Sequence, residues 1–70
     1  MTLQLEEIQP GWTVVDASGE ELGSVIGVEA DAIRIKKSGL MGGEWRAPRD
    51  SVAEIETGRI ELRLTKNELS

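Results

Sequence analysis

Short apolar segments, separated by glycine and polar turns, run through the whole chain at near-regular intervals. Apolar and polar residues alternate with a period of two in the clearest of them, which is typical of half-buried β-strands. Before the C-terminal end no segment has the 3.6-residue periodicity of an amphipathic helix. The segments that we expect to be extended are Trp12 to Val15, Glu21 to Glu29, Ile33 to Lys36, Glu44 to Ala47, a segment of uncertain register that contains Val52 and Ile55, and Ile60 to Leu64.

Glycine and proline positions predict how these segments are joined and bent. Asp16 opens a polar turn in which its side chain accepts bonds from following backbone amides. Gly23 and Gly27 lie inside a strand segment, where glycine marks a bulge or a close backbone approach. Pro48 cannot donate to a central ladder, so it should end or edge its strand. Glycine-bent strands with few exposed edges indicate an all-β fold, a small, partly closed antiparallel β-barrel of five or six strands.

Three local features complete this picture. Val52 and Ile55 lie three residues apart, which requires a bulge or a loop-to-strand change between them. The chain turns at Gly58, and we expect Glu54 and Glu56 before this turn to form ion pairs with Arg59 and Arg63 after it. The segment from Thr65 to Glu68 matches a capping box, which predicts at most one helical turn at the end of the chain.

A length of 70 residues restricts the chain to one domain, residues 1–70, with a small core. The sequence has neither cysteine nor histidine, which removes disulfides, thiolate metal sites and the commonest general base. The residues before Ile8 are acidic rather than basic, and no apolar segment approaches the length of a membrane span. We therefore expect a cytoplasmic domain that does not span a membrane.

No pattern in the sequence predicts a catalytic, cofactor or metal site. Asp16, Glu20 and Glu21 crowd one turn, but residues at the sixth and twelfth positions from Asp16 are glutamate and glycine, the reverse of an EF-hand loop. The glycine-rich segment 38–43 lacks the Gly-Lys-Ser/Thr ending of a phosphate loop. The serines have no histidine to activate them. We expect a domain that is not an enzyme and needs no cofactor.

The candidate functional residues are therefore those that would contact a partner. Trp45 is the preferred interface anchor, because tryptophan is enriched at binding hot spots and Arg46 follows it directly. Leu40 and Met41 either pack back onto the barrel or contact a partner. Val25 should point away from the face that Leu22, Ile26 and Val28 share. The predicted interface set is Trp45, Leu40, Met41, Val25 and Arg46.

Charge bears on the class of partner. The formal net charge of −5 repels nucleic acid and anionic lipid overall. The basic residues are scattered, and a solvated strand face accounts for them, but they also permit an RNA- or ribosome-associated role as the alternative. The residues that would then form a local basic face are Arg34, Lys36, Lys37, Arg46 and Arg49.

The turn glycines, one proline and the aliphatic positions together resemble the PRC-barrel superfamily, and most of all its small stand-alone bacterial members of unknown function. The pattern G-x-x-V-x-D-x-x-G-x-x-x-G-x-V is matched by Gly11, Val14, Asp16, Gly19, Gly23 and Val25. The resemblance implies a six-stranded barrel that holds proteins together without a catalytic site, and it transfers no functional residue. We therefore expect a protein-interaction or scaffold module, one whose partner is another protein or a second copy of itself.

Overall fold

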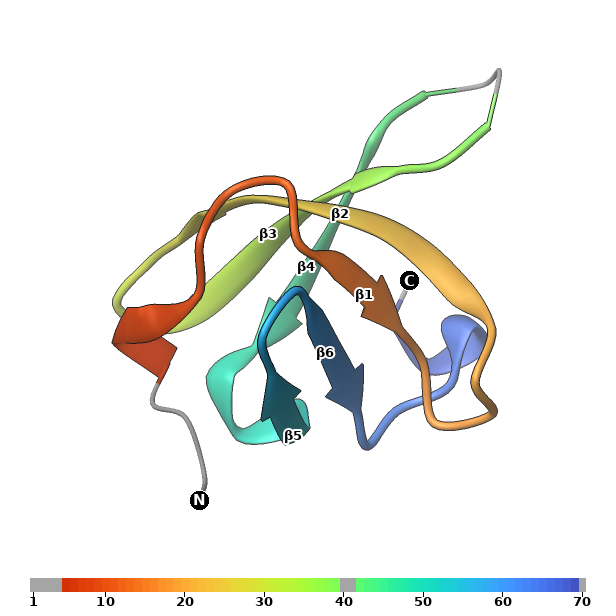
Figure 1. Ribbon diagram of the computed structural model, residues 1–70. Helices are drawn as coiled ribbons and strands as arrows, with labels where there is room; N and C mark the ends of the chain where they lie inside the picture. Colours follow the sequence, from red (N-terminus) through yellow and green to blue (C-terminus); the bar gives the residue numbers. More distant parts are fainter. Residues whose placement is uncertain (1–4, 40–41, 70) are drawn as a thin grey trace.

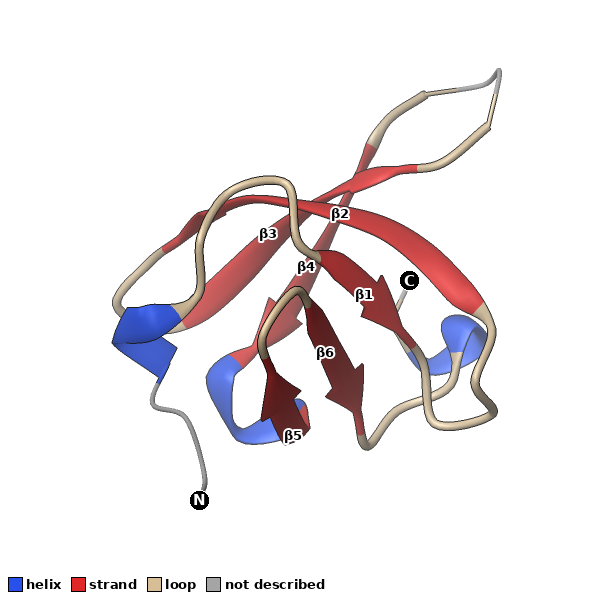
Figure 2. Cartoon of the chain, viewed as in Figure 1, coloured by secondary structure: helices blue, strands red, loops and turns tan. Residues whose placement is uncertain are grey.

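The computed structural model describes residues 5–39 and 42–69 and consists of one strongly curved six-stranded sheet. Figure 1 shows the strands wrapping around a common interior, and Figure 2 shows the short 3₁₀ helices outside the sheet. The strands are β1 (Thr13–Val15), β2 (Glu21–Val28), β3 (Ala32–Lys37), β4 (Glu44–Pro48), β5 (Val52–Glu56) and β6 (Arg59–Leu62), and the 3₁₀ helices are η1 (Leu5–Glu7), η2 (Arg49–Ser51) and η3 (Lys66–Glu68).

The strand order is β4-β3-β2-β1-β6-β5, and the prediction of a purely antiparallel sheet is wrong at its centre. β1 pairs with β6 in parallel, whereas the other four pairs are antiparallel. The reason lies at η2, a corner through which the chain passes from β4 to β5 without the reversal that a hairpin makes. β6 then returns beside β1 in the same direction. The all-β class is confirmed, and the sheet is mixed and open, with β4 and β5 as its edges.

The core is formed by aliphatic side chains on the concave face of the sheet. Ile33, Ile35 and Ile60 are fully buried, as the alternation of their segments predicted, and Leu62 is 1% exposed. Trp12 and Trp45 are only half-buried and pack against this cluster from its periphery. A core this small contributes limited apolar burial, so backbone geometry has a large share in specifying the fold.

Both bends predicted for β2 are present. The pairing of β1 with β2 shifts register between Val14 and Val15, and the pairing of β2 with β3 shifts between Val25 and Gly27. The backbones of β2 and β3 approach closely at Gly23, because a Cβ atom built on it would come within 1.8 Å of the Lys36 carbonyl oxygen. Glycine is therefore required at this position by close backbone approach.

The turn after β1 is organised by the buried carboxylate of Asp16, which is 1% exposed. Oδ1 accepts hydrogen bonds from the Ser18 and Glu20 amides, both at 2.9 Å, and from Ser18 Oγ at 2.6 Å. Oδ2 accepts a bond from the Lys66 amide at 2.9 Å and so links this turn to η3. The predicted forward bonds are confirmed, and the long-range one was not foreseen.

The bulge predicted between Val52 and Ile55 is confirmed in the edge strand β5, since the pairing of β5 with β6 shifts register between Val52 and Glu54. Arg59 pairs with Glu56 at 3.3 Å, as expected. Glu54, in contrast, lies directly opposite Glu61 rather than an arginine. Like charges directly opposite each other on neighbouring strands destabilise a sheet.

Glu54→Lys should therefore stabilise the protein, because it replaces a cross-strand repulsion with an attraction to Glu61. We expect an increase of about 0.2–1 kcal/mol in the free energy of unfolding. Urea unfolding at low salt measures it, and Glu7→Lys in η1 makes the same change in net charge away from any sheet partner. An equal gain in Glu7→Lys would assign the effect to net charge and not to the Glu54 and Glu61 pair.

Candidate functional site

The most distinctive surface of the described chain is the β4 edge, where one tryptophan and two charged residues alternate. Trp45 and Ala47 lie opposite Ile35 and Ile33 of β3 in the strand register, and they face the interior. Glu44 and Arg46 lie opposite Lys36 and Arg34 on the outer face. The alternation follows from the period-two pleat, and Pro48 ends the strand at φ −59° and ψ 148°. β4 has a hydrogen-bonded neighbour on one side only.

Trp45 is held at the rim of the core by contacts on its ring. The Nζ atom of Lys37 lies 4.3 Å from the ring centroid, within the range of a cation–π interaction. The indole Nε1 is buried from solvent and has no hydrogen-bond partner among the described residues. A buried N–H without an acceptor costs free energy. Trp45 therefore has a ring held in contact with Lys37 and an indole N–H that donates to no described residue.

The outer face of β4 carries ion pairs that the spacing of the sequence did not reveal. Arg34 donates to Glu44 through Nε at 3.3 Å and through Nη2 at 2.8 Å, and this bidentate bond raises the pKa of Arg34. Arg46 has a side chain that is 60% exposed, and it contacts Glu29 at 3.0 Å and Asp31 at 3.2 Å. Surface pairs of this kind add little stability individually.

The prediction for Val25 is wrong, because this residue is 3% exposed and belongs to the core. Leu22 and Val25 are both buried although they lie three residues apart, so the alternation breaks between them, where the pairing of β1 with β2 passes from Gly23 to Glu21; Ile26 and Val28 are 37% and 36% exposed. A single inserted residue turns every later side chain to the other face. Gly23 was the available sign of this irregularity.

The remaining predicted interface residues have mixed outcomes. Trp45 is partly exposed and Arg46 is exposed, so both are accessible on β4, although whether they contact a partner is not tested. Leu40 and Met41 lie outside the described residues. The exposed pair Ile26 and Val28 was missed as a candidate.

Several described residues of reactive type have structural roles. Ser51 Oγ donates to the Pro48 carbonyl oxygen at 2.6 Å, and Ser18 Oγ donates to Asp16. The bond from Ser18 Oγ and those from backbone amides lower the pKa of Asp16 to about 2. Glu68 accepts from the Thr65 amide at 2.8 Å, which lowers its pKa and completes the expected cap. Over residues 5–39 and 42–69, no cluster of three or more acidic side chains is arranged to hold a metal ion.

The basic residues proposed for RNA contact are largely paired with carboxylates. Arg34 and Arg46 are bonded as described, and Arg49 contacts Glu6 at 3.3 Å and donates to the Ala30 carbonyl oxygen at 3.0 Å. Lys37 lies over Trp45. These pairings reduce the positive potential that a phosphate backbone would meet.

Comparison with known proteins gives the family. Residues 8–70 match the model of DUF2171, described as an uncharacterized protein conserved in bacteria. The chain belongs to this family. The match extends from Ile8, the first buried residue of the described core, to the end of the chain, so the DUF2171 model covers all six strands. No curated protein matches the chain significantly. Among the helical segments that the structure describes, none has the length and apolar character needed to cross a membrane.

Proposed function

We propose that this DUF2171 domain is a non-enzymatic protein-interaction module of the PRC-barrel type that associates with a second copy of itself along β4. The observation that carries the proposal is the pattern of charges on this open edge. An edge strand presents unpaired N–H and C=O groups on which another strand can be added. An added copy would also bury more surface than so small a domain can bury alone.

The alternation along β4 favours one particular self-pairing. In a strand, alternate side chains point to opposite faces of the sheet. When two copies pair antiparallel about a two-fold axis, an odd-numbered residue must therefore lie opposite an odd-numbered one for the concave faces of both copies to be on the same side. When the axis passes through Trp45, each Trp45 faces its counterpart on the concave side of the joined sheet. Glu44 of each copy then lies opposite Arg46 of the other, and two pairs of opposite charges form on the outer face.

Dimerisation should depend on the charge at Arg46. In Arg46→Glu both cross-copy pairs become like-charged, and such juxtaposition costs several kcal/mol at an interface. We expect the dimer dissociation constant to rise by about 100-fold. Sedimentation velocity over a range of protein concentrations measures it, with circular dichroism to verify the fold.

Arg63→Glu is the matched control, because it makes the same charge reversal at an exposed residue away from β4. It should dimerise as the unchanged protein does. A monomer at every concentration of the unchanged protein, or equal weakening by Arg46→Glu and Arg63→Glu, would refute pairing along β4.

A further inference from the structure

The two edges of the sheet carry different patterns of charge. β4 alternates Glu44 with Arg46 on its outer face, whereas β5 carries Glu54 and Glu56. Both β5 glutamates are exposed, and β5, like β4, has a hydrogen-bonded neighbour on one side only. Such an edge presents N–H and C=O groups with which another strand can pair, and natural proteins protect their edges against unwanted pairing.

Glu54 lies where it lowers the stability of its own chain. It faces Glu61 of β6 in the strand register, and the described residues offer it no cation within ion-pair distance. Glu56 contacts Arg59 at 3.3 Å, but this pair is largely exposed and therefore weak. Edge strands retain charges of this kind, at a cost in stability, because the charges repel a second strand.

A second copy cannot add its own β5 to this edge without bringing like charges together. Side chains two residues apart in a strand share a face, so Glu54 and Glu56 both lie on the outer face of β5. If two copies paired antiparallel about a two-fold axis at Ile55, Glu54 of each would lie opposite Glu56 of the other, and both contacts would be repulsive. An axis at Glu54 or at Glu56 places a glutamate opposite its own counterpart.

Pairing of β5 with β4 of another copy is disfavoured by the same charges. With the outer faces matched, the two β5 glutamates lie opposite Glu44 and Arg46, so one of the two contacts is repulsive. This head-to-tail arrangement would otherwise continue into a filament, because each copy keeps an unused edge. The bulge between Val52 and Glu54 interrupts the regular ladder of β5 as well. Only β4 with β4 therefore has complementary charges at both positions.

We propose that Glu54 and Glu56 close the β5 edge to strand addition by other copies of this chain, and that they thereby prevent the fold from assembling into filaments. This inference concerns β5 and holds whether or not β4 pairs with a second copy. A single charge reversal should open the edge, because it gives β5 the alternation of opposite charges that β4 has.

Glu54→Lys is the variant that tests this closure. A pair of copies centred on Ile55 then forms two attractive contacts in place of two repulsive ones. Within the chain the new side chain faces Glu61, so the fold is not weakened. Sedimentation velocity should show a larger species than the unchanged protein forms, in a proportion that rises with protein concentration. The stability gain expected for the same variant is intramolecular and does not depend on concentration.

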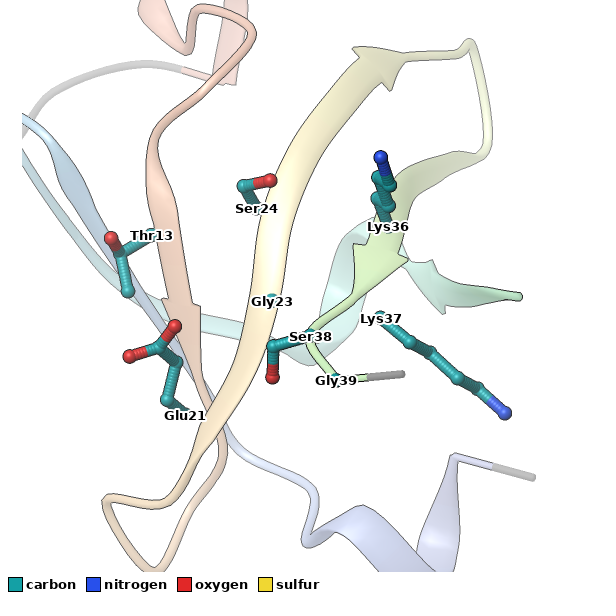
Figure 3. A pocket seen from close by; sticks show the side chains of 8 residues that line it. All are labelled: Thr13, Glu21, Gly23, Ser24, Lys36, Lys37, Ser38 and Gly39. Carbon is teal, nitrogen blue, oxygen red and sulfur yellow. The ribbon is translucent and has the colours of Figure 1, made fainter. Parts of the chain in front are cut away.

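Glu21→Lys is the matched control, because Glu21 is exposed in β2, a strand with a neighbour on each side. Figure 3 shows its carboxylate next to Thr13 of the neighbouring strand β1. The double variant Glu54→Lys/Glu56→Lys restores like charges to β5, although its net charge is closer to zero than that of the unchanged protein. Both should keep the association state of the unchanged protein, and circular dichroism verifies that each variant is folded.

The outcomes separate this inference from the pairing of β4. If β4 pairs as proposed, the unchanged protein stops at a dimer and Glu54→Lys extends beyond it. If β4 does not pair, the unchanged protein is a monomer and Glu54→Lys forms a dimer, which equally supports a closed β5 edge. An unchanged protein that assembles beyond a dimer, a Glu54→Lys variant no larger than Glu21→Lys, or equal association of the single and double β5 variants would overturn the proposal.

Discussion

Gly23→Ala should lose about 3 kcal/mol or more of folding free energy, enough to leave a substantial unfolded population in so small a domain. The new Cβ atom would lie 1.8 Å from the Lys36 carbonyl oxygen and 2.8 Å from its carbonyl carbon. Both are backbone atoms of β3, so no side-chain rotation relieves the overlap. The overlap is relieved only if β2 moves away from β3, which breaks hydrogen bonds between the two strands. Urea unfolding followed by circular dichroism measures the loss.

Gly27→Ala is the matched control within the same strand. A Cβ atom at Gly27 meets nothing within 4 Å, and its φ angle lies outside the left-handed range. Alanine there should be neutral or stabilise the protein by up to about 1 kcal/mol, because it reduces the freedom of the unfolded chain. Equal losses in the two variants would mean that general β-strand disruption, and not the approach of β3, makes Gly23 necessary.

Asp16→Ala should lower the melting temperature by an amount on the order of 10 °C. It would leave three backbone amides, those of Ser18, Glu20 and Lys66, without their acceptor. Because the Lys66 amide belongs to η3, the C-terminal turn should loosen together with the turn after β1. Hydrogen exchange at the Lys66 amide reports this coupling, since it should accelerate in Asp16→Ala.

Asp16 also makes stability depend on pH. The hydrogen bond from Ser18 Oγ, with those from backbone amides, lowers its pKa from 3.8 to about 2 in the folded state. The unfolded chain therefore binds the proton more readily, and the contribution of the carboxylate is complete above pH 3.8 and is lost as pH falls towards 2. Asp16→Asn should be less stable than the unchanged protein at pH 7, and the difference should shrink between pH 4 and pH 2. A constant difference would contradict this role for the Asp16 charge.

Local chemistry made much of the fold predictable. The alternation around Ile33 and Ile35 identified a strand with its buried face, and Pro48 marked the end of an edge strand. Asp16 organised its turn through bonds to residues two and four positions away. In each case the interactions that decide the structure are formed by neighbours in sequence.

Features that depend on distant segments were not predictable. The parallel pairing of β1 with β6 depends on the direction in which η2 leads the chain, and no residue pattern encodes that direction. The error at Val25 arose because a period of two was assumed to continue from Leu22 through the irregularity beside Gly23. The partners of Arg34 and Arg46 lie ten or more positions away, so the sequence suggested free positive charge where the structure has ion pairs.

The β4 candidate site combines both kinds of information. Trp45 was identified from its residue type, since tryptophan anchors interfaces more often than most residues. Its unpaired indole N–H and the position of Lys37 over its ring became visible only in three dimensions. The opposite charges of Glu44 and Arg46 suggest pairing with a second copy only because β4 is an edge strand.

Self-association along β4 is tested most directly by mixing two variants that cannot pair with themselves. Glu44→Lys places like charges opposite each other in a self-pair, and so does Arg46→Glu, but a mixed pair has opposite charges at both positions. Sedimentation equilibrium of each variant alone, and of their 1:1 mixture, separates these cases. The account predicts monomers of each variant and a heterodimer in the mixture, with the affinity of the unchanged protein largely restored. A mixture that remains monomeric while the unchanged protein dimerises would contradict the Trp45-centred register, and a monomeric unchanged protein would contradict self-association.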